Sequence, residues 1–126
     1  MDLVNIVAAL AVLQFIVFSF LVGKAREAHG VKAPAVQGNE QFERVFRVQM
    51  NTMEQLICFL PALLLANVYW SDTFVALVGI VYLVGRLIYR QSYITDPSKR
   101  AMGFLLTIVP TFVLLIAAII GALMGK

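Results

Sequence analysis

Four long apolar runs, separated by short polar segments, dominate the hydrophobic pattern of the chain. Each run is long enough to cross a bilayer, whose hydrocarbon core takes about 20 helical residues. The pattern predicts helices at about residues 3–23, 40–70, 73–94 and 98–124. Because the connections between them are short, consecutive helices must be antiparallel. We therefore predict an all-α integral membrane four-helix bundle of up-down topology, with residues 1–126 forming a single domain.

The segments between these runs carry the signals of loops and helix ends. Residues 28–40 are polar, contain Gly and Pro and show no periodicity, which is typical of a loop. Ser71-Asp72 forms a very short turn. Asp96 is a suitable N-cap for the fourth helix, and Pro97 suits a first helical position. Pro61, inside the second run, is expected to kink that helix.

Composition supports membrane insertion and excludes several functions. Hydrophobic residues make up 61% of the chain and charged residues 13%, with a mean hydropathy of +0.88. A water-soluble domain of this size does not need so much apolar surface. One cysteine allows no intrachain disulfide, and one histidine cannot build a metal site. Nucleotide-binding loops and zinc-protease motifs are absent from the sequence, and a net charge of +3 does not indicate nucleic acid binding.

The distribution of basic residues predicts the orientation in the membrane. Nine of the ten lie between Lys24 and Arg47 or between Arg86 and Arg100. The positive-inside rule then places both of these connections in the cytoplasm and both termini outside. We expect a bacterial inner membrane, because the chain is short and has no retrieval tail.

Two polar stripes interrupt the apolar pattern. In the second helix Glu43, Arg47, Asn51 and Glu54 are spaced by four, four and three residues. At about 100° per residue these side chains share roughly a quarter of the helix circumference. Ionisable groups at membrane depth cost on the order of 2.5–3.5 kcal/mol each, so they need a partner. Either they form interhelical ion pairs that fix packing, or they line a ligand site.

The third helix carries the second stripe, formed by Tyr82, Arg86, Tyr89 and Tyr93. Arg86 is expected either to extend towards water or to meet Glu54. Both stripes open at the cytoplasmic face, where a converging set is predicted from Arg26, Arg47, Glu54, Arg86, Tyr89, Tyr93 and Arg100. Arginines, a carboxylate and phenols suit a small zwitterionic anion, and the adjacent lipid would supply an apolar co-substrate.

The segment Phe42–Glu54, FERVFRVQMNTME, resembles the second-helix signature of the membrane-associated proteins in eicosanoid and glutathione metabolism, the MAPEG family. Val81–Tyr93, VYLVGRLIYRQSY, resembles the third-helix pattern of its leukotriene-synthase and microsomal glutathione transferase branch. The similarity covers nearly the whole chain. It departs from that branch at Gln55, where tyrosine is usual, and at Ile88, where a basic residue occurs.

The resemblance implies a homotrimer that holds glutathione, without a metal, in clefts between protomers. It assigns glutathione binding to Arg26, Arg47, Gln49, Asn51, Glu54, Arg86, Tyr89 and Tyr93. Arg100 falls at the position that stabilises the glutathione thiolate, so it is the predicted catalytic residue. A free thiol has a pKa of about 8.5, and an adjacent guanidinium favours the thiolate.

The expected function is therefore a detoxifying glutathione transferase that acts on hydrophobic electrophiles or lipid-derived substrates, with possible peroxidase activity on lipid hydroperoxides. Two alternatives remain open. A non-catalytic lipid-binding branch of the same family lacks the arginine and glutamate that match Arg47 and Glu54. A small four-helix multidrug exporter would use a membrane-embedded acid, usually in its first helix, and that helix has none here.

Overall fold

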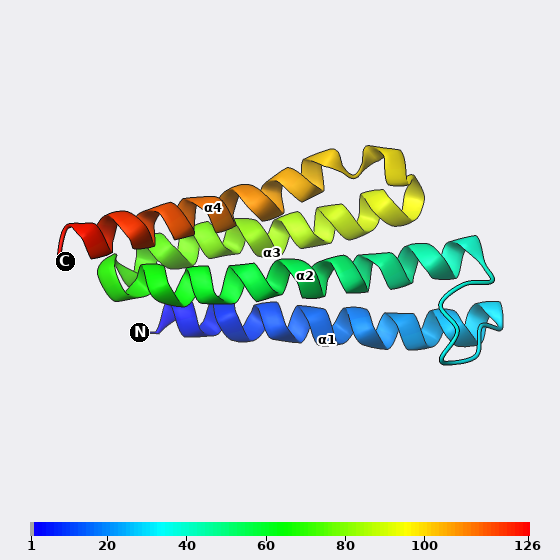
Figure 1. The fold of residues 1–126 in the computed structure, drawn as a ribbon. Helices are drawn as coiled ribbons and strands as arrows, with labels where there is room; N and C mark the ends of the chain where they lie inside the picture. The colour runs from blue at the N-terminus through cyan, green and yellow to red at the C-terminus, as the bar shows by residue number, and fades with distance from the viewer. Residues whose placement is uncertain (1) are drawn as a thin grey trace.

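A computed structural model describes residues 2–126 as four long antiparallel helices (Figure 1). Their bounds are α1 Leu3–His29, α2 Glu40–Tyr69, α3 Asp72–Thr95 and α4 Ala101–Leu123, with a short 3₁₀ helix η1 at Pro97–Lys99. Both termini lie at one end of the bundle, and the α1–α2 and α3–α4 connections lie at the other. The predicted all-α four-helix architecture is confirmed, and all four helices are long and apolar enough to cross a membrane.

The structure differs from the sequence expectation at two helix boundaries. α1 continues to His29, six residues beyond the predicted end, because Val22 and Ala25 pack against Phe42 of α2. Gly30 ends the helix in a left-handed conformation with φ of 66°. α4 begins at Ala101, later than expected, because the residues after Asp96 form the 3₁₀ helix first.

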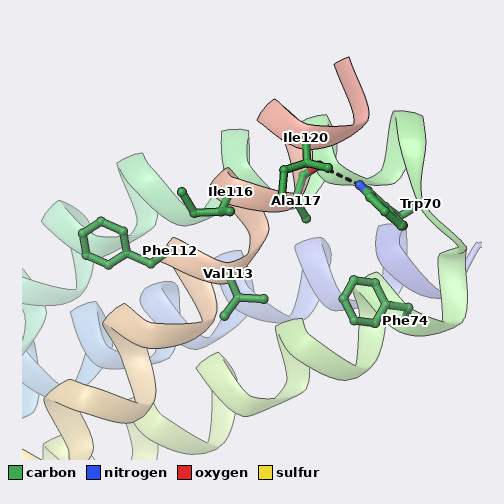
Figure 2. Close-up of a pocket in the computed structure, with 7 residues that line it drawn as sticks. All are labelled: Trp70, Phe74, Phe112, Val113, Ile116, Ala117 and Ile120. Atoms are coloured by element: carbon green, nitrogen blue, oxygen red, sulfur yellow. Dashed lines mark hydrogen bonds between the residues drawn. The ribbon is translucent and has the colours of Figure 1, made fainter. Parts of the chain in front are cut away.

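The end of the bundle that holds the termini carries an apolar groove. Trp70, at the end of α2, donates a hydrogen bond from Nε1 to the carbonyl oxygen of Ala117 in α4 at 2.6 Å (Figure 2). Next to this bond lies an apolar groove of about 420 Å³, lined by Trp70, Phe74, Phe112, Val113, Ile116, Ala117 and Ile120. None of these lining residues carries an ionisable group, so the groove itself offers no acid, base or nucleophile.

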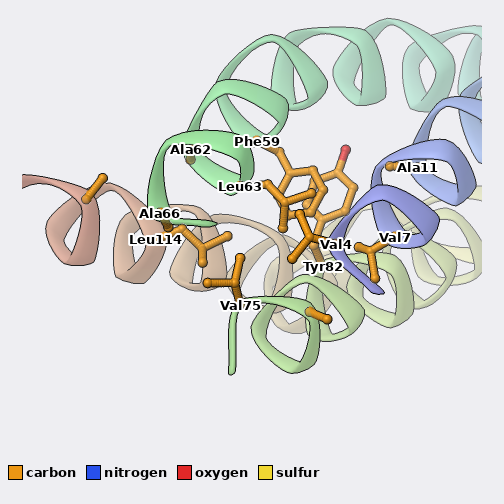
Figure 3. Packing of buried hydrophobic residues seen from close by; sticks show 12 residues of the cluster. Val4, Val7, Ala11, Phe59, Ala62, Leu63, Ala66, Val75, Tyr82 and Leu114 are labelled. Atoms are coloured by element: carbon orange, nitrogen blue, oxygen red, sulfur yellow. The ribbon is translucent and has the colours of Figure 1, made fainter. Parts of the chain in front are cut away.

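A buried apolar core fills the same half of the bundle (Figure 3). The rings of Phe59 and Tyr82 stack in its centre with centroids 3.8 Å apart. Val4 of α1, Leu63 of α2 and Leu114 of α4 belong to the same cluster, so three helices contribute to this core beside Tyr82 of α3.

Close packing of α3 and α4 depends on two glycines. A Cβ on Gly85 would lie 2.6 Å from the backbone carbonyl carbon of Leu106. A Cβ on Gly103 would lie 2.4 Å from the backbone N and Cα of Tyr89. Small residues let helix backbones approach in membranes, where packing contributes more than the hydrophobic effect. The two helices are therefore in near backbone contact beside Tyr89.

Asp72 fixes the start of α1 against α3. Its carboxylate accepts hydrogen bonds from the backbone N–H groups of Leu3 at 2.8 Å and Val4 at 3.2 Å. These two donors belong to the first turn of α1 and have no partner within that helix. Since the neighbouring Asp2 makes no side-chain cap, Asp72 provides the cap from another helix.

We expect Asp72→Ala to lower the stability of the purified protein by about 1–2 kcal/mol, the range for loss of a helix cap. Thermal unfolding in detergent would measure this as a reduced Tm. Asp2→Ala is the matched control, because it removes an acid beside the same helix without removing a cap. Equal Tm values for the two variants would contradict the capping role.

Candidate functional site

A polar cavity of about 470 Å³ lies between α2, α3 and the start of α4, at the end of the bundle with the two connections. This volume is in the range of small-molecule sites. The lining residues are Phe46, Arg47, Met50, Asn51, Glu54, Tyr89, Tyr93 and Arg100. Three residues of the second-helix stripe and two of the third-helix stripe therefore face one shared space, whereas Glu43, Tyr82 and Arg86 do not line it.

α2 contributes Arg47, Asn51 and Glu54, whose spacings of four and three residues place them on one face of the helix. Arg47 and Glu54 are exposed. Within residues 2–126, one pair of oppositely charged side chains has nitrogen and oxygen atoms within 4 Å of each other, and it joins Arg44 to Glu40. None of the three charged residues that line the cavity, Arg47, Glu54 and Arg100, is thus neutralised by another side chain of residues 2–126, which disfavours a purely packing role for Arg47 and Glu54.

α3 contributes two phenols. The rings of Tyr89 and Tyr93 stack with centroids 5.6 Å apart and planes 27° apart. Tyr89 is buried against α4 at Gly103, while Tyr93 is half-buried nearer the helix end. This stack forms one wall of the cavity and offers hydroxyl groups that can both donate and accept hydrogen bonds.

Arg100 enters the cavity from the junction of η1 and α4. Its Nη1 donates to the carbonyl oxygen of Pro97 at 2.8 Å. Asp96 caps the same turn, accepting from the Ser98 hydroxyl at 2.8 Å and the Ser98 backbone N–H at 3.1 Å. The Ser98 hydroxyl, followed by that N–H, holds the pKa of the Asp96 carboxyl below its ordinary value. The cap is therefore ionised at neutral pH.

Arg86 lies beneath the cavity instead of lining it. Its side chain is 0% exposed, so it does not extend to water, and it forms no ion pair with Glu54. Nη1 donates to Asn51 Oδ1 at 2.8 Å. The guanidinium carbon sits 4.3 Å from the centre of the Tyr89 ring. Arg86 thus contacts two lining residues from below.

The sequence model described as "MAPEG family" matches residues 4–120. The chain belongs to the MAPEG family. An uncharacterised Synechocystis protein is 42% identical over 118 residues, covering 94% of this chain and 86% of that protein. Human microsomal glutathione S-transferase 2 is 38% identical over 117 residues, and guinea pig leukotriene C4 synthase shows the same identity over the same length. Each of these two alignments covers 93% of this chain and 78% of the relative.

Besides Arg86, two residues assigned from the MAPEG resemblance do not line the cavity of the single chain. Arg26 is at the end of α1, where Nη1 donates to the carbonyl oxygen of Ala35 at 2.6 Å. Gln49 faces α1 and donates from Nε2 to Ser19 Oγ at 3.0 Å. Both are held on the α1–α2 side, while the cavity lies on the α2–α3–α4 side. Their role in ligand binding stays a prediction.

Four residues that line the cavity or hold Arg86 were not predicted from the sequence. Phe46 and Met50 line the cavity with apolar surface. Thr52 and Thr107 hold Arg86 from α2 and α4. Thr107 stands in an otherwise apolar helix, one turn before Thr111, and this interruption was the available signal.

The donor set of the cavity matches the chemistry of glutathione, which carries two carboxylates and one ammonium. Arg47 can donate paired hydrogen bonds to a carboxylate, and the guanidinium of Arg100 can stabilise a nearby thiolate. Glu54 can accept from an ammonium, and Asn51 with the two tyrosines supplies neutral hydrogen bonds. The apolar surface of Phe46 and Met50 suits a less polar part of a ligand. The residues present therefore fit the tripeptide.

Proposed function

We propose that this protein is a membrane-bound glutathione transferase that conjugates glutathione to hydrophobic electrophiles. One observation supports the proposal: six of the nine residues assigned from the sequence line a single cavity, and the oppositely charged Arg47 and Glu54 among them are not paired to each other. Relatives named as a glutathione transferase and a leukotriene C4 synthase support the same chemistry.

In the proposed mechanism the polar residues bind and orient glutathione at the cavity mouth. Arg47 pairs with a ligand carboxylate and Glu54 with the ligand ammonium. The guanidinium of Arg100 favours the thiolate over the thiol, whose proton passes to solvent. The sulfur then attacks an electrophilic carbon, forming a C–S bond while the leaving group departs. The apolar acceptor reaches the sulfur from the surrounding lipid.

The proposal includes a homotrimer in the bacterial inner membrane, with the cavity facing the cytoplasm and both termini outside. Arg26, at the end of α1, and Gln49, on the side of α2 that faces α1, support the assembly, because both lie away from the cavity of their own chain and would contribute to a neighbour's site. The basic connections at the cavity end support the orientation. Detoxification of lipid-soluble electrophiles would be the biological role.

The test combines two measurements on the detergent-purified protein. Conjugation of glutathione to chlorodinitrobenzene reports turnover by release of chloride and gain of absorbance, while calorimetry reports glutathione binding. Saturable binding with turnover is the expected result. Binding without turnover would direct the next assay to a lipid hydroperoxide. A folded sample with neither property would refute the proposal and favour a lipid-binding or transport role.

Arg47→Ala should weaken glutathione binding itself. Loss of a charge-assisted hydrogen bond is worth about 1.5–3 kcal/mol, so the Kd should rise on the order of tenfold or more. Calorimetry measures this directly. Lys99→Ala is the matched control, since it removes one exposed positive charge at the same end without touching the cavity. An unchanged Kd for Arg47→Ala would contradict the assigned contact.

A further inference from the structure

Arg86 is held by neutral acceptors from the two helices that face α3. Nε donates to Thr107 Oγ1 of α4 at 3.0 Å. Nη1 donates to two groups of α2, Asn51 Oδ1 at 2.8 Å and Thr52 Oγ1 at 3.1 Å. Leaving the donors of a buried cation without acceptors is costly, so the bonds from Nε and Nη1 restrict where the guanidinium can lie. Nη2 is buried and has no hydrogen-bond partner within residues 2–126.

The two threonines are oriented to accept. Thr52 donates its hydroxyl hydrogen to the carbonyl oxygen of Val48 at 2.7 Å. Thr107 donates in the same way to the carbonyl oxygen of Gly103 at 2.9 Å. Each hydroxyl has one hydrogen, so only lone pairs are left for Arg86. Both contacts to the guanidinium therefore have a fixed direction.

The same donor and acceptor argument determines the orientation of the Asn51 amide. A guanidinium has donors and no acceptor, so the Asn51 atom that faces it must be the carbonyl oxygen Oδ1. The amide –NH₂ group is what remains for the cavity, which Asn51 lines. We propose that Arg86, held by Thr52 and Thr107, is a positioning residue that makes Asn51 a hydrogen-bond donor towards the ligand.

This arrangement defines which ligand atom is accepted beside Asn51. The matching group is a carbonyl or carboxylate oxygen, and a ligand N–H at that point is rejected because it would face another donor. The inference rests on the proposed function, where that oxygen belongs to glutathione. No carboxylate of residues 2–126 lies within 4 Å of Arg86, so its positive charge also favours an anionic ligand above Asn51 and Tyr89.

A simpler role for Arg86 would be to tie α2, α3 and α4 together. The two roles predict different coupling between Thr107 and Asn51 in ligand binding. If Thr107 acts through Arg86 on Asn51, its effect on ligand binding must disappear when the Asn51 amide is absent. If Thr107 only stabilises the bundle, its effect must persist in that background.

The test is a double-mutant cycle on the full-length protein, with glutathione binding measured by calorimetry. Thr107→Val keeps the shape and removes the acceptor for Nε. We expect it to raise the Kd about fivefold, as for one weakened hydrogen bond, and to have less than about a twofold effect in an Asn51→Ala background. The same fold-change in both backgrounds would overturn the inference.

Two further variants test whether Asn51 donates a hydrogen bond to the ligand and whether the effect at Thr107 is specific to its contact with Arg86. Asn51→Asp replaces the donor by a carboxylate, so it should bind glutathione more weakly than Asn51→Ala, and wild-type affinity would overturn the inference. Thr111→Val removes a buried hydroxyl one turn along α4 that bonds to Thr107 O at 3.2 Å and not to Arg86, so the Kd should not change. Absence of binding to the folded wild type would instead overturn the proposed function, and this inference with it.

Discussion

Replacing Arg100 by alanine should leave glutathione binding largely intact while lowering turnover about 100-fold, the order measured when one charge-stabilising donor is removed from an active site. Arg100 differs from Arg47 in its position, because it enters the cavity from the η1–α4 junction while the other contacts come from α2 and α3. Its side chain is exposed and bonds only to the Pro97 carbonyl, so its loss leaves the fold intact.

The pH dependence of Arg100→Ala gives a second readout. A nearby guanidinium lowers the pKa of a thiol, so its removal should return the glutathione thiol towards its ordinary pKa of about 8.5. The thiolate then forms only at higher pH, and the turnover profile of the variant should move to alkaline pH by the same amount. Arg100→Lys, which keeps a charge but not the planar fork, should lie between the two.

Kinetics with glutathione as the varied substrate, together with calorimetry, separate the two possible roles of Arg100. A lower kcat with an unchanged Kd is expected. Equal loss of binding and turnover would show that Arg100 is a binding residue and would refute the thiolate assignment. A pH profile identical to that of the wild type would have the same consequence.

Helical periodicity was sufficient to predict the two walls of the cavity. Arg47, Asn51 and Glu54 recur on one face of α2, and Tyr89 and Tyr93 on one face of α3. The short connection at Ser71 makes these helices antiparallel neighbours, so both stripes must open at the same end. Bundle architecture and family membership are confirmed, while the binding and catalytic roles of these residues stay predictions.

Helical periodicity could not predict how deep a side chain such as Arg86 lies in the bundle, or which helix packs against it. Arg86 shares the stripe of Tyr89 but lies one turn further into the bundle, where it bonds upward to Asn51. Another partner, Thr107, comes from α4, which carries neither of the two polar stripes predicted from the sequence. Packing also extended α1 to His29, because a charged segment can stay helical when Ala25 on one side is buried.

Gly103→Ala should destabilise the protein and impair the site together. Its new Cβ would lie 2.4 Å from the backbone of Tyr89, which cannot rotate away, so α4 must move from α3. Overpacking of this kind costs about 1–3 kcal/mol. Gly103 lies between Arg100 and Thr107 in the sequence. The same movement of α4 would therefore shift Arg100 away from the cavity and Thr107 away from Arg86. We expect a lower Tm, a higher Kd for glutathione and reduced turnover.

Gly23→Ala is the matched control, because no atom lies within 4 Å of a Cβ added there, in the middle of α1. Alanine is favoured over glycine in a helix by about 1 kcal/mol, so this variant should be as stable as the wild type or more stable. Unfolding in detergent and glutathione calorimetry on both variants decide the question. If Gly103→Ala keeps the wild-type Tm and Kd, then the contact between α3 and α4 at Tyr89 does not hold the cavity in shape.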